Sequence, residues 1–169
     1  VYSMNRLQNH LVLNKVNAET GASEIWYEEK DAAYVEISDD IRFLENGGFI
    51  WTSDMSGFNH IYEIDSKGKI KRQITKGEWD VTSFYGINED AGKLFYQSAE
   101  VHPTERNVYS ISIKGKGKKN LTPEKGTTSA AFSKSFDYFF STYSSVDIPT
   151  QVDLRDAAGT VVREIEKNQ

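Results

Sequence analysis

The residues that could carry out chemistry in this chain are few and scattered. Its three histidines, His10, His60 and His102, stand far apart and lack the close paired spacing typical of metal ligands. Two adjacent carboxylate pairs, Glu28-Glu29 and Asp39-Asp40, would point to opposite faces of a strand, because side chains alternate along it. We therefore interpret both pairs as solvated turns or strand ends. No metal and no cofactor is expected.

The familiar signatures of catalysis are also missing. The sequence has no G-x-S-x-G nucleophile elbow, no P-loop, no H-E-x-x-H pair and no EF-hand loop. It has no cysteine, which excludes disulfides and thiol chemistry. The net charge is −5, and the one lysine cluster, Lys114–Lys119, alternates with glycine like a solvated hairpin turn. Nucleic acid is therefore not an expected partner, and no apolar run is long enough to predict a membrane span.

An internal repeat is the strongest structural signal. The phrase Asn59–Asp65 returns as Asn107–Ile113, so that Tyr62 and Tyr109 are 47 residues apart. Further along each copy, Thr75 and Thr122 are also 47 residues apart. A period in the forties with several strands per unit is typical of β-propeller blades.

Strand signals separated by turns run along the whole chain, with no long helical pattern. They predict an all-β fold, a single partial β-propeller over residues 1–169 made of about three to four four-stranded antiparallel blades. The blades are placed near residues 1–32 (partial), 33–78, 80–126 and 127–166. Because three to four blades cannot close a ring, we expect an uncovered blade face through which the isolated segment self-associates. The aromatic residues expected to stack between blades are Phe43, Trp51, Phe84, Phe95, Tyr96, Phe132, Phe139 and Phe140.

Two residues invite a functional interpretation that the repeat makes unnecessary. His60 lies inside a predicted strand, so a packed or hydrogen-bonded role is favoured over a catalytic one. Trp79 falls at the junction between two repeats. It could line a central tunnel, but a wedge between blades already explains its position.

Several phrases together resemble the β-propeller domain of the dipeptidyl peptidase IV family, in the prolyl oligopeptidase group of serine peptidases. The resemblance is to bacterial members of the Bacteroidetes type. The residues that we assign to its structural blade motifs are Gly57, His60, Tyr62, Gly77, Trp79, Arg106 and Tyr109. The phrases are Asn5-Arg6-Leu7-Gln8-Asn9, Ser53 to Tyr62, Ile74 to Val81 and Pro103 to Tyr109.

The resemblance implies a parent enzyme that removes N-terminal dipeptides ending in proline or alanine. In that family an α/β-hydrolase domain carries the catalytic Ser, Asp and His, and the propeller scaffolds it and limits access to peptides. The implied segment has no catalytic residue of its own and should be inactive alone. Its implied partners are the hydrolase domain of the parent chain and a peptide substrate. The expected location is periplasmic or exported.

The resemblance also bears on which residues face the substrate. The family binds the substrate amine with a glutamate pair on a helical insertion, and Glu28-Glu29 lies instead in an ordinary blade strand, so that role is not transferred. A propeller loop that faces the extended substrate pocket corresponds to Tyr34–Ser38, which makes Tyr34 and Glu36 the candidate substrate-facing residues. The alternative is a TolB-like, non-enzymatic propeller that binds a protein. A Gly-Trp-Ser-Tyr-Gly-Gly-like elbow beyond Gln169 would decide for the peptidase.

Overall fold

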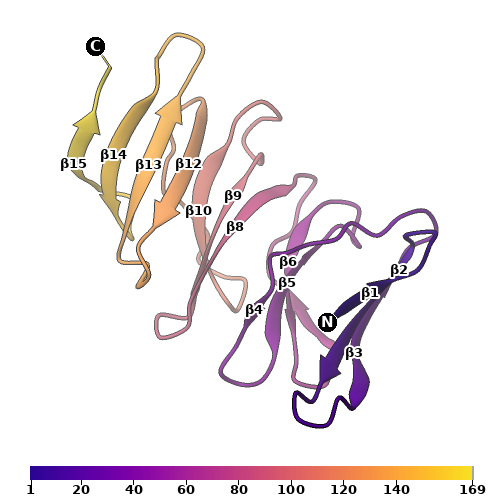
Figure 1. The fold of residues 1–169 in the computed structure, drawn as a ribbon. Helices are drawn as coiled ribbons and strands as arrows, with labels where there is room; N and C mark the ends of the chain where they lie inside the picture. The colour runs from indigo at the N-terminus through magenta and orange to yellow at the C-terminus, as the bar shows by residue number, and fades with distance from the viewer. Residues whose placement is uncertain (169) are drawn as a thin grey trace. The chain divides into compact units, whose positions relative to one another are not determined.

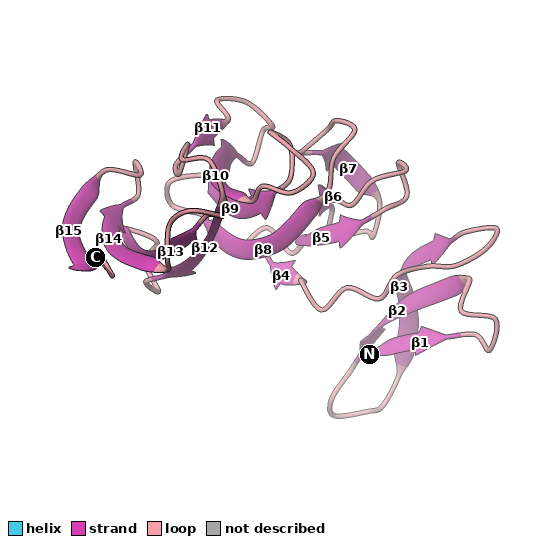
Figure 2. Cartoon of the chain, turned by 90° about the horizontal axis from the view of Figure 1, so that it is seen from above, coloured by secondary structure: helices cyan, strands magenta, loops and turns pink. Residues whose placement is uncertain are grey.

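The computed structural model describes residues 1–168, and in this part of the chain only strands, turns and loops are found (Figures 1 and 2). The chain divides into two compact units, Val1–Gln73 and Ile74–Gln169. None of the described residues lies in a helix that could cross a membrane. Each unit consists of two antiparallel sheets in which every strand pairs with its sequence neighbour, as the predicted meander requires.

The first unit contains a three-stranded and a four-stranded sheet. Their strand orders are β1-β2-β3 and β4-β5-β6-β7. The strands are β1 (Tyr2–Met4), β2 (His10–Val16), β3 (Ser23–Lys30), β4 (Arg42–Phe43), β5 (Phe49–Ser53), β6 (His60–Ile64) and β7 (Ile70–Gln73).

The second unit contains two four-stranded sheets with the orders β8-β9-β10-β11 and β12-β13-β14-β15. The strands are β8 (Val81–Asn88), β9 (Lys93–Ser98), β10 (Asn107–Ser112), β11 (Lys119–Asn120), β12 (Thr127–Phe132), β13 (Tyr138–Ser144), β14 (Gln151–Asp156) and β15 (Val161–Glu166). The all-β class and the antiparallel sheets agree with the prediction.

Aspartate and glycine shape the outer hairpin of the first unit. The side chain of Asp65 accepts hydrogen bonds from the backbone N–H groups of Lys67 and Lys69, both at 2.9 Å, which closes the β6–β7 turn. Gly68 follows with a φ of 75°, and a Cβ there would overlap the carbonyl oxygen of Trp26. The outer turn of the first unit is therefore built to touch the neighbouring sheet, because only glycine combines this φ with so close an approach.

The first unit has its core between its two sheets. Leu11, Leu13 and Tyr27 from the first sheet pack against Phe49 and Trp51 from the second, and all five are buried. Tyr27 meets both partners edge-on, with centroids 6.0 Å from those of Phe49 and Trp51. Edge-on aromatic pairs of this kind stabilise a core beyond the area they bury.

The second unit repeats this design. Phe95 packs against Phe132 and Phe136 at centroid distances of 4.7 and 5.2 Å, and Phe139 joins them from β13. Val108 and Leu121 complete the cluster. Aromatic residues of one sheet therefore cover the face of the preceding one, as expected for stacked blades.

The strand β11 ends at Asn120, directly before Leu121 and Thr122. There the hydroxyl of Thr122 accepts the backbone N–H of Val108 at 2.9 Å, so a side chain replaces the acceptor of a sheet ladder. Of the predicted stacking residues, Phe43 stacks on Trp26 of the neighbouring sheet, with ring centroids 5.9 Å apart, although it is 64% exposed. Phe140 is 48% exposed and is not a buried wedge in the described structure.

Candidate functional site

The segment between β3 and β4 carries the candidate substrate-facing residues. Asp31 begins it by accepting the backbone N–H groups of Ala33 at 2.7 Å and Tyr34 at 3.2 Å. These two bonds lower the pKa of Asp31, because they stabilise the charged carboxylate. The backbone of the segment is thus turned directly before Tyr34 by a local contact that the sequence encodes.

Val35 anchors the middle of the segment. Its side chain is 1% exposed in the core of the first unit, and its N–H donates to the carbonyl of Gln8 at 2.9 Å. The neighbours Tyr34, 44% exposed, and Glu36, also exposed, remain accessible. The buried valine therefore presents an aromatic ring and a carboxylate at the surface of a fixed backbone.

The end of the segment is tied to the second sheet. The hydroxyl of Ser38 hydrogen-bonds that of Thr52 in β5 and also accepts the N–H of Asp40 at 3.1 Å. Thr52 is buried. Three anchors, at Asp31, Val35 and Ser38, thus hold a connection that the sequence alone would describe only as a loop.

Glu29, next to this segment in the chain, forms a buried polar centre. Its carboxylate accepts hydrogen bonds from the hydroxyl of Tyr27 at 3.1 Å, from the indole N–H of Trp51 at 3.0 Å and from the hydroxyl of Ser53. The residue is 8% exposed. Burial, followed by the neighbouring Glu29 charge, raises the pKa of Tyr27 well above its usual value. The carboxylate joins the two sheets of the first unit through donors from both.

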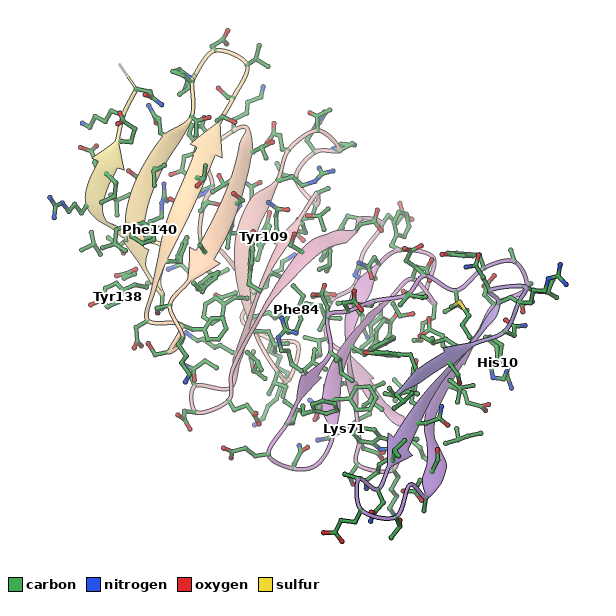
Figure 3. The ribbon with its side chains drawn as sticks, in the orientation of Figure 1. His10, Lys71, Phe84, Tyr109, Tyr138 and Phe140 are labelled. Atoms are coloured by element: carbon green, nitrogen blue, oxygen red, sulfur yellow. The ribbon has the colours of Figure 1, made fainter. Side chains whose placement is uncertain are left out.

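This centre corrects the interpretation of Glu28-Glu29 as solvated. The two side chains do point to opposite faces: Glu28 pairs with His10 at 3.0 Å and Lys30 at 3.7 Å on the surface (His10 is labelled in Figure 3). Glu29, however, lies opposite the buried Leu11 in the sheet register. The sequence signal for the burial of Glu29 was its spacing of two residues from Tyr27, because side chains two residues apart in a strand lie on the same face.

The residues assigned to blade motifs occupy turns and buried strand positions. In the first unit, Gly57 closes a turn with a φ of 97°, His60 is 1% exposed, and the buried Tyr62 donates its hydroxyl to Ser56 at 2.8 Å. His60 is thus packed in the interior of the sheet.

In the second unit the remaining motif residues support the loops. Gly77 has a φ of 148°, and a Cβ there would lie 2.0 Å from the indole nitrogen of Trp79. Trp79 stacks on Tyr96, with ring centroids 6.3 Å apart, and Tyr96 stacks on Tyr109 at 5.5 Å. Arg106 donates to the carbonyls of Pro103 and Glu105, both at 2.8 Å.

A cation lies beside the stack of Trp79, Tyr96 and Tyr109, which we call the aromatic ladder. Lys118 lies 5.5 Å from the ring centroid of Trp79 and pairs with Glu100 at 2.6 Å. Burial, followed by the charge of Glu100, raises the pKa of both Tyr96 and Tyr109. Lys118 is thus more than the solvated turn residue that the alternating Lys-Gly pattern predicts.

Arg155 is the second buried charge that sequence reasoning missed. It is 5% exposed, and its guanidinium donates to Glu124 at 2.7 Å and to the hydroxyl of Ser141 at 3.1 Å. It also lies 3.4 Å from Asp153 and from the carbonyl oxygens of Leu121 and Gly159. It fixes the loop after β11 onto the last sheet.

That loop lines one side of an open pocket of about 720 Å³ in the second unit. Thr104 and Glu105 line another side, and Tyr143 to Ile148 the rest. The hydroxyl of Tyr143 donates to the carbonyl of Lys125 at 2.9 Å across it. No group of metal-binding side chains is found among the described residues, here or elsewhere.

The stacked antiparallel sheets define a protein of the β-propeller class, and the comparisons with known proteins specify the family. Residues 1–150 match the model of the dipeptidyl peptidase IV N-terminal region. The chain belongs to this family.

Solved structures and curated sequences agree with this assignment. The chain is similar to the dipeptidyl peptidase 4 of Porphyromonas gingivalis, with 37% identity, a TM-score of 0.92 and coverage of 99% of this chain but 24% of that one. For a structure from Bacteroides ovatus, described as a dipeptidyl aminopeptidase IV, the identity is 26%, the TM-score 0.80 and the coverage 99% and 27%. A sequence from Aspergillus flavus bearing a dipeptidyl peptidase 4 name is 32% identical over 125 residues, 73% of this chain and 14% of its own length. The chain thus spans about a quarter or less of these relatives.

Proposed function

We propose that this chain serves as a non-catalytic propeller segment of a dipeptidyl peptidase IV-like serine exopeptidase, where it scaffolds the enzyme and gates access to the hydrolase active site. The observation that carries the proposal is the match of nearly the entire chain, at 37% identity, to one part of the Porphyromonas enzyme. The proposed partners are an α/β-hydrolase domain and a peptide whose N-terminal dipeptide ends in proline or alanine. The proposed location is periplasmic or exported.

Within this function, Tyr34 and Glu36 are proposed to face the peptide. The proposal is supported by the three anchors that fix their backbone and by the exposure of both side chains. An exposed ring can pack on an apolar substrate residue, and a carboxylate can pair with a substrate cation. Because their backbone is already ordered, such contacts would cost little conformational entropy on binding.

Two assays test these statements. The purified segment should not cleave a Gly-Pro chromogenic substrate, and turnover that a serine-directed inhibitor blocks would contradict the non-catalytic role. In a parent enzyme carrying the segment, Tyr34→Ala and Glu36→Gln should raise KM for an extended peptide about 3- to 10-fold with little change in kcat, which is the loss of binding common to ground and transition states. Tyr138→Ala, which removes a ring of similar exposure from another sheet, is the matched control. An unchanged KM in both variants would exclude the substrate-facing role.

A further inference from the structure

The loop Asn5–Asn9, which joins β1 to β2, is closed by the side chain of Asn5. Its amide oxygen accepts the backbone N–H groups of Asn9 and His10, both at 3.1 Å, and its amide nitrogen donates to the side chain of Asn9 at 2.8 Å. The carbonyl oxygen of Asn5 also accepts the N–H of Gln8 at 3.0 Å. One exposed side chain therefore ties together the backbone of the whole loop.

This loop in turn holds the segment that carries the candidate substrate-facing residues. The carbonyl oxygen of Asn9 accepts the N–H of Asp31 at 3.1 Å, and the carbonyl oxygen of Gln8 accepts the N–H of Val35 at 2.9 Å. The two bonds lie on either side of the turn that Asp31 makes directly before Tyr34. The position of the segment thus depends on two carbonyl groups of the β1–β2 loop.

The backbone of Gln8 is strained where it makes this connection. Its φ is 55°, in the left-handed region that favours glycine. A non-glycine residue is uncommon there, and such strain persists only where the surrounding bonds hold it. At Gln8 these bonds are the N–H to Asn5 and the carbonyl to Val35. The bond to the segment is therefore made by a residue whose conformation the Asn5 turn maintains.

A second asparagine in the same sheet closes a loop that does not touch the segment. The side chain of Asn17, between β2 and β3, accepts the N–H groups of Glu19 and Thr20, both at 2.9 Å. Its carbonyl oxygen accepts the N–H of Gly21 at 2.9 Å. The bonds of Asn17 in the described structure stay within its own hairpin, so it shares the local chemistry of Asn5 without the connection onward.

We propose that Asn5 is a positioning residue for extended peptide substrates, because it fixes the carbonyl groups of Gln8 and Asn9 that hold the backbone beside Tyr34 and Glu36. The inference rests on the proposed substrate-facing role of those two residues. A segment that is ordered before the peptide arrives loses less conformational entropy on binding. Loss of the Asn5 side chain should therefore weaken the binding of peptides long enough to reach the segment and leave bond cleavage itself unchanged.

Kinetics of a parent enzyme that carries this segment test the inference. Asn5→Ala should raise KM for an extended peptide about 3-fold with kcat unchanged, because the substrate must then order the segment. KM for a short Gly-Pro chromogenic substrate should not change. Asn5→Asp keeps the acceptor for both backbone N–H groups and should restore most of the affinity. Asn17→Ala, which opens a comparable turn, is the matched control and should leave both KM values unchanged.

Hydrogen exchange in the same enzyme measures the positioning directly. The backbone amides of Asp31 and Val35 should exchange about 10-fold faster in Asn5→Ala than in the wild type, and at the wild-type rate in Asn17→Ala. Unchanged exchange at these amides in Asn5→Ala would overturn the inference. A KM for the Gly-Pro substrate that rises as much as the KM for the extended peptide would also overturn it, because the effect would then be general.

The variants at the segment itself separate this inference from the proposed function. If Tyr34→Ala and Glu36→Gln raise KM for the extended peptide and Asn5→Ala does not, the positioning role falls and the substrate-facing role stands. If Tyr34→Ala and Glu36→Gln leave that KM unchanged, the substrate-facing role falls, and the positioning role for substrate falls with it.

Discussion

The two units build the same sheet contact around different chemistry. In the first, the contact holds Trp51 in β5 and Ile64 in β6. Phe49 pairs with Ile64 and Phe139 pairs with Arg155. Phe49 and Phe139 are 90 residues apart, which is two repeats of 45, so Arg155 takes the place of Ile64. The serine two residues beyond Phe139, Ser141, likewise takes the place of Trp51 and bonds Arg155. One backbone repeat thus accepts either an aromatic-aliphatic pair or a serine-arginine pair.

The difference shows how each unit ties in its loops. The first unit buries an acceptor, Glu29, and brings side-chain donors to it. The second buries a donor, Arg155, and brings carboxylates and carbonyl oxygens to it from the surrounding loops. A guanidinium with five donors can satisfy several backbone acceptors at once, which a tryptophan cannot. Each unit therefore buries the kind of charged group, an acceptor or a donor, that the polar groups around it can bond.

The largest expected effect comes from removing the arginine. Arg155→Ala should lower the free energy of unfolding of the second unit by about 3–5 kcal/mol, because Ser141 and the loop acceptors lose a buried charged partner. Arg155→Ile, which restores the residue of the first unit, should cost clearly less, since it fills the volume. Urea unfolding followed by circular dichroism measures both. Equal losses in the two variants would contradict the view that the repeat tolerates either pair.

A somewhat smaller loss is expected at the acceptor of the first unit. Glu29→Gln keeps the shape but turns one carboxylate oxygen into a donor facing other donors, and should cost about 2 kcal/mol. Glu28→Gln, in the exposed neighbour, is the control and should change stability by less than about 0.5 kcal/mol. Urea unfolding followed by tryptophan fluorescence in a Trp79→Phe background reports on this unit through Trp26 and Trp51. A Glu29→Gln variant as stable as its control would show that the carboxylate of Glu29 does not stabilise the core.

Alkaline pH should weaken both units through their buried tyrosines. The pKa values of Tyr27 in the first unit and Tyr96 in the second are raised on folding, by burial first and by a neighbouring glutamate second. The unfolded chain then releases these protons first, so stability is complete below about pH 10, the unfolded value, and falls as the pH rises above it. The urea midpoint between pH 8.5 and 10.5 tests this sign. A midpoint that rises over this range would refute it.

The smallest effect is expected at the aromatic ladder of the second unit. Lys118→Met keeps most of the alkyl chain but removes the ion pair with Glu100 and the charge over Trp79. Because Lys118 is partly exposed, the loss should be about 0.5–1 kcal/mol, and it should shrink in 0.5 M salt. Lys116→Met, in the same turn, is the control. A loss that salt leaves unchanged would indicate packing instead of charge.

The sequence by itself determined the repeat, and through it the all-β class, the antiparallel meander and the burial of residues such as His60 and Phe95. These follow from local rules, since alternation, turn residues and a fixed period act within one hairpin. The family resemblance was likewise readable from short phrases, because it depends on residue identity alone.

Only the tertiary structure decided which polar residues are buried and which aromatic residues are not. Glu29 and Glu28 are chemically identical, and Glu29 becomes a core residue because Trp51 and Ser53, more than 20 residues away, supply donors. Arg155 is buried because a loop 31 residues earlier brings Glu124 to it. Phe95 and Phe140 share one pattern, and whether another sheet covers each of them is a property of the packing between sheets, which no local pattern encodes.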